Sequence, residues 1–132
     1  MTEMPQGVRP LSPHLQIYRP RVNMVMSILH RITGAALYLG TLLLAAWLMA
    51  TAMGEPAFAA VAWFFAHPLG KLVLFAYSFA LIHHMLGGIR YLIWDTGRGF
   101  ALWQVDLMCW LTLVGSLALT AVVWTLALLR GA

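Results

Sequence analysis

Charged side chains are scarce in this sequence of 132 residues. Only 9% of the residues are charged, eight of them basic and four acidic, whereas a soluble globular domain has about 25% charged residues. So few charges do not cover a water-facing surface, which excludes a soluble globular protein and a disordered chain. The net charge of +4 does not indicate nucleic-acid binding either, because the basic residues do not form a long solvated face.

Cysteine is nearly absent, since the one cysteine is Cys109 within an apolar run. A single cysteine excludes a disulfide framework within this chain, and it excludes a zinc or iron–sulfur site built from cysteines. We interpret Cys109 as a small buried apolar residue. The first 26 residues lack the apolar segment of a signal peptide and contain four prolines and three arginines. We therefore expect residues 1–23 to form a short irregular cytoplasmic segment.

Hydrophobic residues make up 62% of the chain, and they form three long runs. The runs cover residues 24–53, 68–94 and 103–129, and each exceeds the roughly 20 residues that cross a bilayer core. Because lipid offers no hydrogen-bond partners, each run must satisfy its own backbone as a helix. The sequence predicts an all-α integral membrane protein, in which residues 24–132 form a bundle of three transmembrane helices. Residues 57–67 are apolar and aromatic, which favours an interfacial turn of helix.

The basic residues predict the orientation in the membrane. Six of the eight lie at one predicted end of the bundle, and the positive-inside rule places that end in the cytoplasm. The N-terminus and the 95–102 loop then face the cytoplasm, while the 54–67 loop and the C-terminus face outward. The six are Arg9, Arg19, Arg21, Arg31, Arg90 and Arg98, whereas Lys71 and Arg130 fall at the other end.

A first polar cluster begins the first helix. Ser27, His30 and Arg31 are spaced i, i+3 and i+4, so they share one side of a helix. A hydroxyl, an imidazole and a guanidinium at the depth of the membrane interface can bind a quinone carbonyl or an acidic cofactor group. The alternative is that His30 and Arg31 only extend toward lipid headgroups.

A second cluster lies in the second helix, around His83 and His84. A neutral imidazole in the membrane can ligate haem iron, and a flat macrocycle needs a flat helix surface beside the ligand. Gly87 and Gly88 follow His84 at i+3 and i+4 and supply such a surface. Spacing does not choose between the histidines, because Gly87 is also i+4 from His83. The alternative is that both histidines pack against helices and bind backbone carbonyls.

His84 is ten residues from Trp94, about 15 Å along the helix and near the middle of the membrane. Arg90 and Tyr91 lie nearer the cytoplasm and can reach a haem propionate. A low-spin b-type haem takes two axial ligands, and the remaining histidines are expected at other depths than His84. We therefore expect the second ligand to come from another subunit.

Two carboxylates outside these clusters offer less. Asp95 lies in the loop beside Arg98 and can carry protons toward the interface, although a solvated or helix-capping carboxylate is the simpler interpretation. Asp106 begins the third helix, where an acid suits the helix dipole.

Three stretches together resemble a known family. They are RPLSPHLQIY at 9–18, SILHRITG at 27–34 and HMLGGIRYLIWD at 84–95. The first two stretches resemble the first signature of the cytochrome b subunit of succinate dehydrogenase (respiratory complex II), and the third stretch resembles its second signature. This subunit is the large membrane anchor of the complex. The resemblance covers about residues 9–99, and the third helix matches only as a hydrophobic span. Because the motif starts nine residues into the sequence, a bacterial cytoplasmic membrane is expected rather than an organelle.

The resemblance implies a four-subunit complex. A flavoprotein with FAD oxidises succinate, an iron–sulfur subunit passes the electrons on, and two anchor subunits share haem b and help to bind ubiquinone. This chain would have no activity alone. Tyr91 departs from the family, which often has His or Phe there, and this weakens only the propionate assignment of that residue. The implied residues are Ser27, Arg31 and Asp95 at the quinone, His84 as axial ligand, and His30, Arg31, Arg90 and Tyr91 at the propionates.

Two other functions remain open from the residues. A fumarate reductase anchor that uses menaquinol shares the same chemistry, and the reaction direction depends on the quinone and the flavoprotein. A haem-free membrane scaffold or small transporter subunit is the alternative from another class. A transporter would need more paired charge within the membrane, and the third helix contains none.

Overall fold

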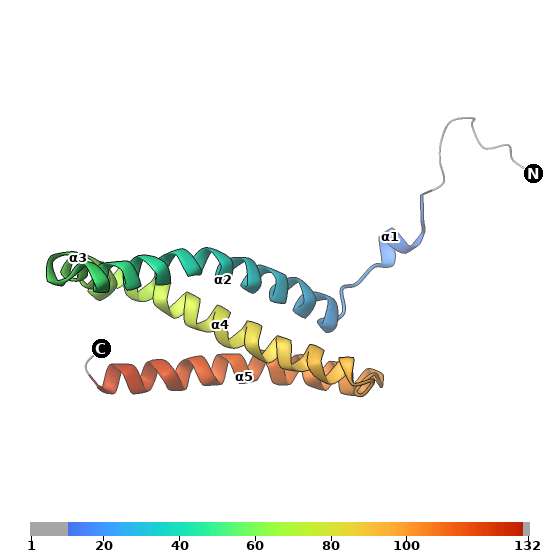
Figure 1. The fold of residues 1–132 in the computed structure, drawn as a ribbon. Coiled ribbons are helices and arrows are strands. Elements are labelled where there is room, and N and C mark those ends of the chain that lie inside the picture. The colour runs from blue at the N-terminus through green and yellow to red at the C-terminus, as the bar shows by residue number, and fades with distance from the viewer. Residues whose placement is uncertain (1–10, 131–132) are drawn as a thin grey trace, which may run out of the picture.

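The computed structural model describes residues 11–130, and that part of the chain contains five helices and no strand (Figure 1). Three helices are long and apolar enough to cross a membrane. The prediction of an all-α membrane protein with three spans is therefore confirmed. The helices are α1 (His14–Ile17), α2 (Val22–Met53), α3 (Glu55–Ala66), α4 (Pro68–Asp95) and α5 (Leu102–Leu129).

The ends of the helices follow from glycine, proline and histidine. Gly54 ends α2 with φ +97°, a value that L side chains rarely adopt. Pro56 and Pro68 lie in the first turns of α3 and α4. The backbone N–H groups of a first turn have no acceptor within the helix, so proline costs no hydrogen bond there. His67 caps α4, since its Nδ1 accepts a hydrogen bond from the Leu69 backbone N–H at 3.3 Å. These signals turn the chain sharply between α2, α3 and α4.

The three long helices pack side by side, and in the view of Figure 1 α4 lies between α2 and α5; α2 also contacts α5. The start of α2 and the connection from α4 to α5 lie at one end of the bundle, and α3 lies at the other. Gly97 and Gly99 have positive φ values of 75° and 81° in that connection, as expected of a tight turn between helices. The described basic residues of the predicted cytoplasmic group share this end, while Arg9 lies outside the described residues. Which side of the membrane this end faces stays a prediction.

The predicted spans compare closely with the helices, and the turn of helix expected in the first connector is a longer helix. Residues 24–53, 68–94 and 103–129 correspond to α2, α4 and α5, each with ends one or two residues away. The 54–67 connector is mostly the helix α3, twelve residues long. Its aromatic side chains extend the apolar surface, so α3 lies against the end of the bundle rather than in water.

Burial in this chain is reversed relative to a soluble protein. Leucines, valines and tryptophans are exposed along all the spans, since lipid takes the place of a core. The buried residues include more polar than apolar side chains. Three of the hydroxyl groups donate to carbonyls of their own helices at 2.7–2.9 Å, which satisfies them without a partner helix. The buried polar residues are Thr33, His83, Arg90, Thr112, Ser116 and Thr120.

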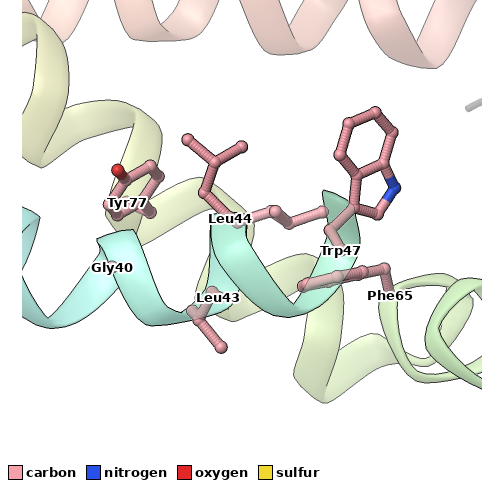
Figure 2. Close-up of a pocket in the computed structure, with 7 residues that line it drawn as sticks. Gly40, Leu43, Leu44, Trp47, Phe65 and Tyr77 are labelled. Atoms are coloured by element: carbon pink, nitrogen blue, oxygen red, sulfur yellow. The ribbon is translucent and has the colours of Figure 1, made fainter. Parts of the chain in front are cut away.

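An apolar cavity of about 300 Å³ lies near the α3 end of the bundle. Figure 2 shows Tyr77 of α4 beside Gly40 of α2, with Phe65 of α3 near Trp47. A Cβ at Gly40 would collide with the Tyr77 ring, so this glycine is what lets the two helices close together. The cavity is lined almost entirely by hydrocarbon, and it lies apart from the histidines.

Candidate functional site

The imidazole rings of His30 and His84 stack on each other between α2 and α4. Their centroids are 4.0 Å apart, and their planes differ by 17°. The expectation that no second histidine shares the depth of His84 is therefore wrong. His30 follows the start of α2 by eight residues and His84 precedes the end of α4 by eleven. In antiparallel helices these offsets, about 12 and 16 Å, place the rings at similar depths.

Two glycines make room for this stack. A Cβ at Gly34 of α2 would lie 2.9 Å from Cε1 of His84, and a Cβ at Gly87 of α4 would collide with Cδ2 of His30. Each ring therefore lies on the backbone of the opposite helix. The sequence had suggested that Gly87 and Gly88 together form a flat surface for a macrocycle. In the structure Gly87 serves His30 instead, whereas Gly88 has open space where its Cβ would be.

The hydrogen bonds of His84 determine which of its nitrogens is available. Its Nδ1 lies 3.1 Å from the backbone carbonyl oxygen of His30, which can only accept. Nδ1 therefore carries the proton, and Nε2 keeps a lone pair, as in an imidazole that ligates a metal. The ring is half-buried, so it is reachable from outside the chain. With the open space at Gly88, this arrangement fits one axial ligand of a haem.

His30 is not placed to be the other axial ligand of the same iron. Axial ligands approach from opposite faces of the macrocycle, and rings stacked at van der Waals distance leave no room for it between them. Within residues 11–130 no group of three or more histidine, cysteine or acidic side chains is close enough to hold a metal ion. A second ligand from another subunit remains the prediction.

His83 points the other way, toward α5. Its side chain is 1% exposed, and its Nδ1 lies 3.1 Å from Oγ of Ser116. A macrocycle cannot reach an imidazole that is enclosed in this way. Spacing alone left the choice of histidine open, and the difference in burial favours His84.

Arg90 lies inside α4, near the end that was expected to face the cytoplasm. It is 3% exposed and donates from Nη1 to Sγ of Cys109 at 3.3 Å. Its guanidinium carbon lies 5.3 Å and 5.2 Å from the ring centroids of Tyr91 and Trp94. Its Nε has no hydrogen-bond partner among the described residues. A buried cation without an anion is costly, so this end of α4 suits an acidic ligand group. Cys109 is 0% exposed, which confirms that it is buried.

Tyr91 contacts both the stacked histidines and the guanidinium of Arg90. Its ring meets His30 edge-on, with centroids 5.0 Å apart, and meets Trp94 at 5.4 Å. The predicted propionate residues His30, Arg90 and Tyr91 are therefore neighbours in the structure. Arg31, the fourth predicted propionate residue, is exposed.

The predicted quinone residues share one end of the bundle but form no hydrogen bond or ion pair with one another. Arg31 and Asp95 are exposed and Ser27 is half-buried. Across residues 11–130, their side chains have no hydrogen bond or ion pair. Asp95 is the last residue of α4, where the helix dipole disfavours an anion, so it does not cap its helix.

Asp106 has a partner that the sequence did not reveal. Its Oδ2 lies 3.5 Å from Nη2 of Arg21, and this ion pair joins the starts of α5 and α2. Asp106 lies beyond the first turn of α5, so the pair rather than the helix dipole explains its position. Only the packing of α2 against α5 brings together residues that are 85 positions apart.

Comparison with known proteins gives consistent matches along the chain. Residues 6–123 match the family described as the succinate dehydrogenase/fumarate reductase transmembrane subunit. The chain is 36% identical to the succinate dehydrogenase cytochrome b556 subunit of Rickettsia typhi, over 94% of this chain and 99% of that protein. It is 39% identical to the cytochrome b556 subunit of Paracoccus denitrificans, over 90% and 92% of the two chains. It is 37% identical to the mitochondrial cytochrome b560 subunit of Sus scrofa, over 86% and 70%.

These matches include the motifs on which the resemblance was based, and they extend it into the third apolar helix. The bacterial relatives and the three apolar helices identify a multi-pass inner-membrane protein. The chain therefore belongs to the family of succinate dehydrogenase/fumarate reductase transmembrane subunits.

Proposed function

We propose that this chain is the cytochrome b membrane anchor of a succinate dehydrogenase, and that it shares haem b with a second anchor subunit. The observation that carries the proposal is the state of His84. It is half-buried, bound through Nδ1 to the His30 carbonyl, and flanked by open space at Gly88. The relatives named as cytochrome b556 and b560 subunits support the same cofactor.

Within this proposal His84 supplies one axial ligand through Nε2. The second ligand is a histidine of the sister anchor. Arg90 is a buried cation with an unbonded Nε, and His30 and Tyr91 are its neighbours, so these residues take the propionates together with Arg31. Bound haem b supplies a one-electron carrier.

The quinone is bound at the same end of the bundle, by Ser27 and Arg31 of α2 and Asp95 of α4. Arg31 remains cationic and favours the negative charge that develops on a reduced quinone oxygen. The Ser27 hydroxyl donates a hydrogen bond to a quinone carbonyl. Asp95 is exposed at the same end of the bundle and relays a proton to the quinol oxygen. Their side chains have no partners within the described residues, so they are available to a ligand.

Electrons reach this site from other subunits. In the proposed complex a flavoprotein oxidises succinate with FAD, and an iron–sulfur subunit delivers the electrons to ubiquinone. The anchor positions the acceptor and has no activity by itself. A fumarate reductase anchor stays the alternative, because the matched family includes both kinds of enzyme. The names of the relatives favour succinate oxidation.

The quinone assignment is tested in the assembled complex with Arg31→Ala and Ser27→Ala. We expect reduction of ubiquinone by succinate to fall by about tenfold to a hundredfold, the range for loss of a charge-assisted hydrogen bond. Reduction of a soluble dye that accepts electrons before the membrane should not change. Arg19→Ala is the matched control, since Arg19 is an exposed arginine at the same end. Normal quinone turnover in both site variants would refute the assignment.

A further inference from the structure

A buried polar pair joins α4 to α5 in the middle of the bundle. His83 of α4 is 1% exposed and Ser116 of α5 is 0% exposed. Nδ1 of His83 lies 3.1 Å from Oγ of Ser116. The ring of His83 also stacks on Phe79, with centroids 5.5 Å apart. The proposed function uses neither residue, and the pair is a buried hydrogen bond between two membrane-spanning helices.

The direction of this hydrogen bond follows from the other bond of Ser116. The Ser116 hydroxyl donates its one proton to the carbonyl of Leu113 at 2.8 Å. Its oxygen can then only accept from His83, so Nδ1 of His83 carries the proton. His83 is therefore held as the same tautomer as His84, and its Nε2 is buried without a partner among the described residues.

The two adjacent histidines hold α4 from opposite sides. His83 donates to Ser116 on α5, and His84 donates to the His30 carbonyl on α2. Successive residues of a helix differ by about 100° around its axis, so both bonds form only at one rotation of α4. A rotation of α4 in either direction that moved Nε2 of His84 would also pull Nδ1 of His83 away from Oγ of Ser116, the acceptor to which it is bonded.

We infer that the His83–Ser116 hydrogen bond is a positioning device, which sets the rotation of α4 and thereby the direction of the His84 imidazole. This inference rests on the proposed role of His84 as an axial ligand. Other hydroxyls of the same helix face do not share the role. Thr112 and Thr120 donate to the carbonyls of Met108 and Ser116 in their own helix, and they form no side-chain bond to α4.

The test compares variants of the pair in the intact complex. Ser116→Ala removes the acceptor, and His83→Phe removes the donor but keeps a ring to stack on Phe79. His83→Asn keeps an N–H donor close to the position of Nδ1. Thr112→Val is the matched control, because it removes a buried hydroxyl that is bonded only within α5.

The readouts are the low-spin g-values of the oxidised haem and the rate of haem loss in detergent. We expect Ser116→Ala and His83→Phe to shift or broaden the g-values, which report the direction of the axial imidazoles. We expect haem loss to become about fivefold faster, the factor that corresponds to one neutral hydrogen bond. His83→Asn and Thr112→Val should keep the parent spectrum and rate.

Three outcomes decide between the inference and the function on which it rests. If Ser116→Ala and His83→Phe match Thr112→Val in both readouts, the positioning role is wrong. If Thr112→Val shifts the spectrum as much as Ser116→Ala, the effect belongs to general packing and the inference also fails. A His84→Leu complex that retains the low-spin signal would instead overturn the proposed haem ligand.

Discussion

The two faces of α4 are built in different ways. Toward α2, aromatic rings lie directly on glycines: His30 on Gly87, His84 on Gly34 and Tyr77 on Gly40. Toward α5, the interface contains hydroxyl groups, a thiol and a buried cation instead. Glycine contacts position a ring by shape, and the nitrogen that His84 uses on this side is bonded to a backbone carbonyl rather than to a side chain. Hydroxyl contacts position a ring by a hydrogen bond that uses one of its nitrogens.

This difference explains why adjacent histidines have unlike surroundings. His84 lies on the face where α2 supplies a carbonyl, a glycine and the stacked His30 ring, and it stays half-buried. His83 lies on the face where α5 closes over it. In a membrane the apolar surface is already solvated by lipid, so the polar contacts and small residues decide how the helices meet. The haem ligand is therefore expected on the glycine face of α4, whereas Arg90 reaches the site from the side that contacts α5.

The largest expected effect comes from replacing the two adjacent histidines, one on each face of α4. We predict that His84→Leu abolishes the b-type absorption bands of the complex, because it removes the proposed axial ligand. His83→Leu should retain these bands, since His83 is enclosed and turned toward α5. Reduced-minus-oxidised spectra of purified membranes measure both. If only the His83 variant lost the bands, His83 rather than His84 would be the haem ligand, and the site would lie on the α5 face of α4.

A smaller effect is expected from adding one methyl group to each face. Gly87→Ala places a Cβ against the His30 ring, and we expect it to destabilise the complex by about 1–3 kcal/mol, as overpacking does. Gly115→Ala on the α5 face meets only Cδ1 of Leu86 at 3.4 Å, an ordinary contact, and should be close to neutral. Thermal unfolding of the purified complex gives both values. Equal losses would show that the two faces are packed alike.

The smallest effect concerns the ion pair that lies outside both faces of α4. Arg21 and Asp106 are 58% and 40% exposed, so water and salt screen their attraction. We expect a double-mutant cycle with Arg21→Ala and Asp106→Ala to give a coupling of about 0.5 kcal/mol. The coupling should weaken in high salt. A value above about 2 kcal/mol would show that this pair, rather than the faces of α4, holds the helices together.

Most of the fold was predictable from composition. Three apolar runs longer than a bilayer core permit only helices, and the glycines at 54, 97 and 99 mark the sharp turns. The motif around His84 was also recognisable, and the matched family agrees with it. The relation between His30 and His84 was missed, because the bounds of two helices do not determine how far the helices are shifted along each other or which faces meet.

The sequence by itself therefore determined that this protein lies in a membrane and that it is helical. It also determined the family and the residue types of the site. Hydrophobic length and local motifs are properties of neighbouring residues, so they need no folded partner. Tertiary structure alone decided that Gly87 serves His30, that Arg90 is buried against Cys109, and that His83 and His84 face different helices. These facts depend on the rotation and depth of each helix relative to its neighbours. In lipid, hydrophobic patterning hardly encodes either one, since all faces of a span are apolar.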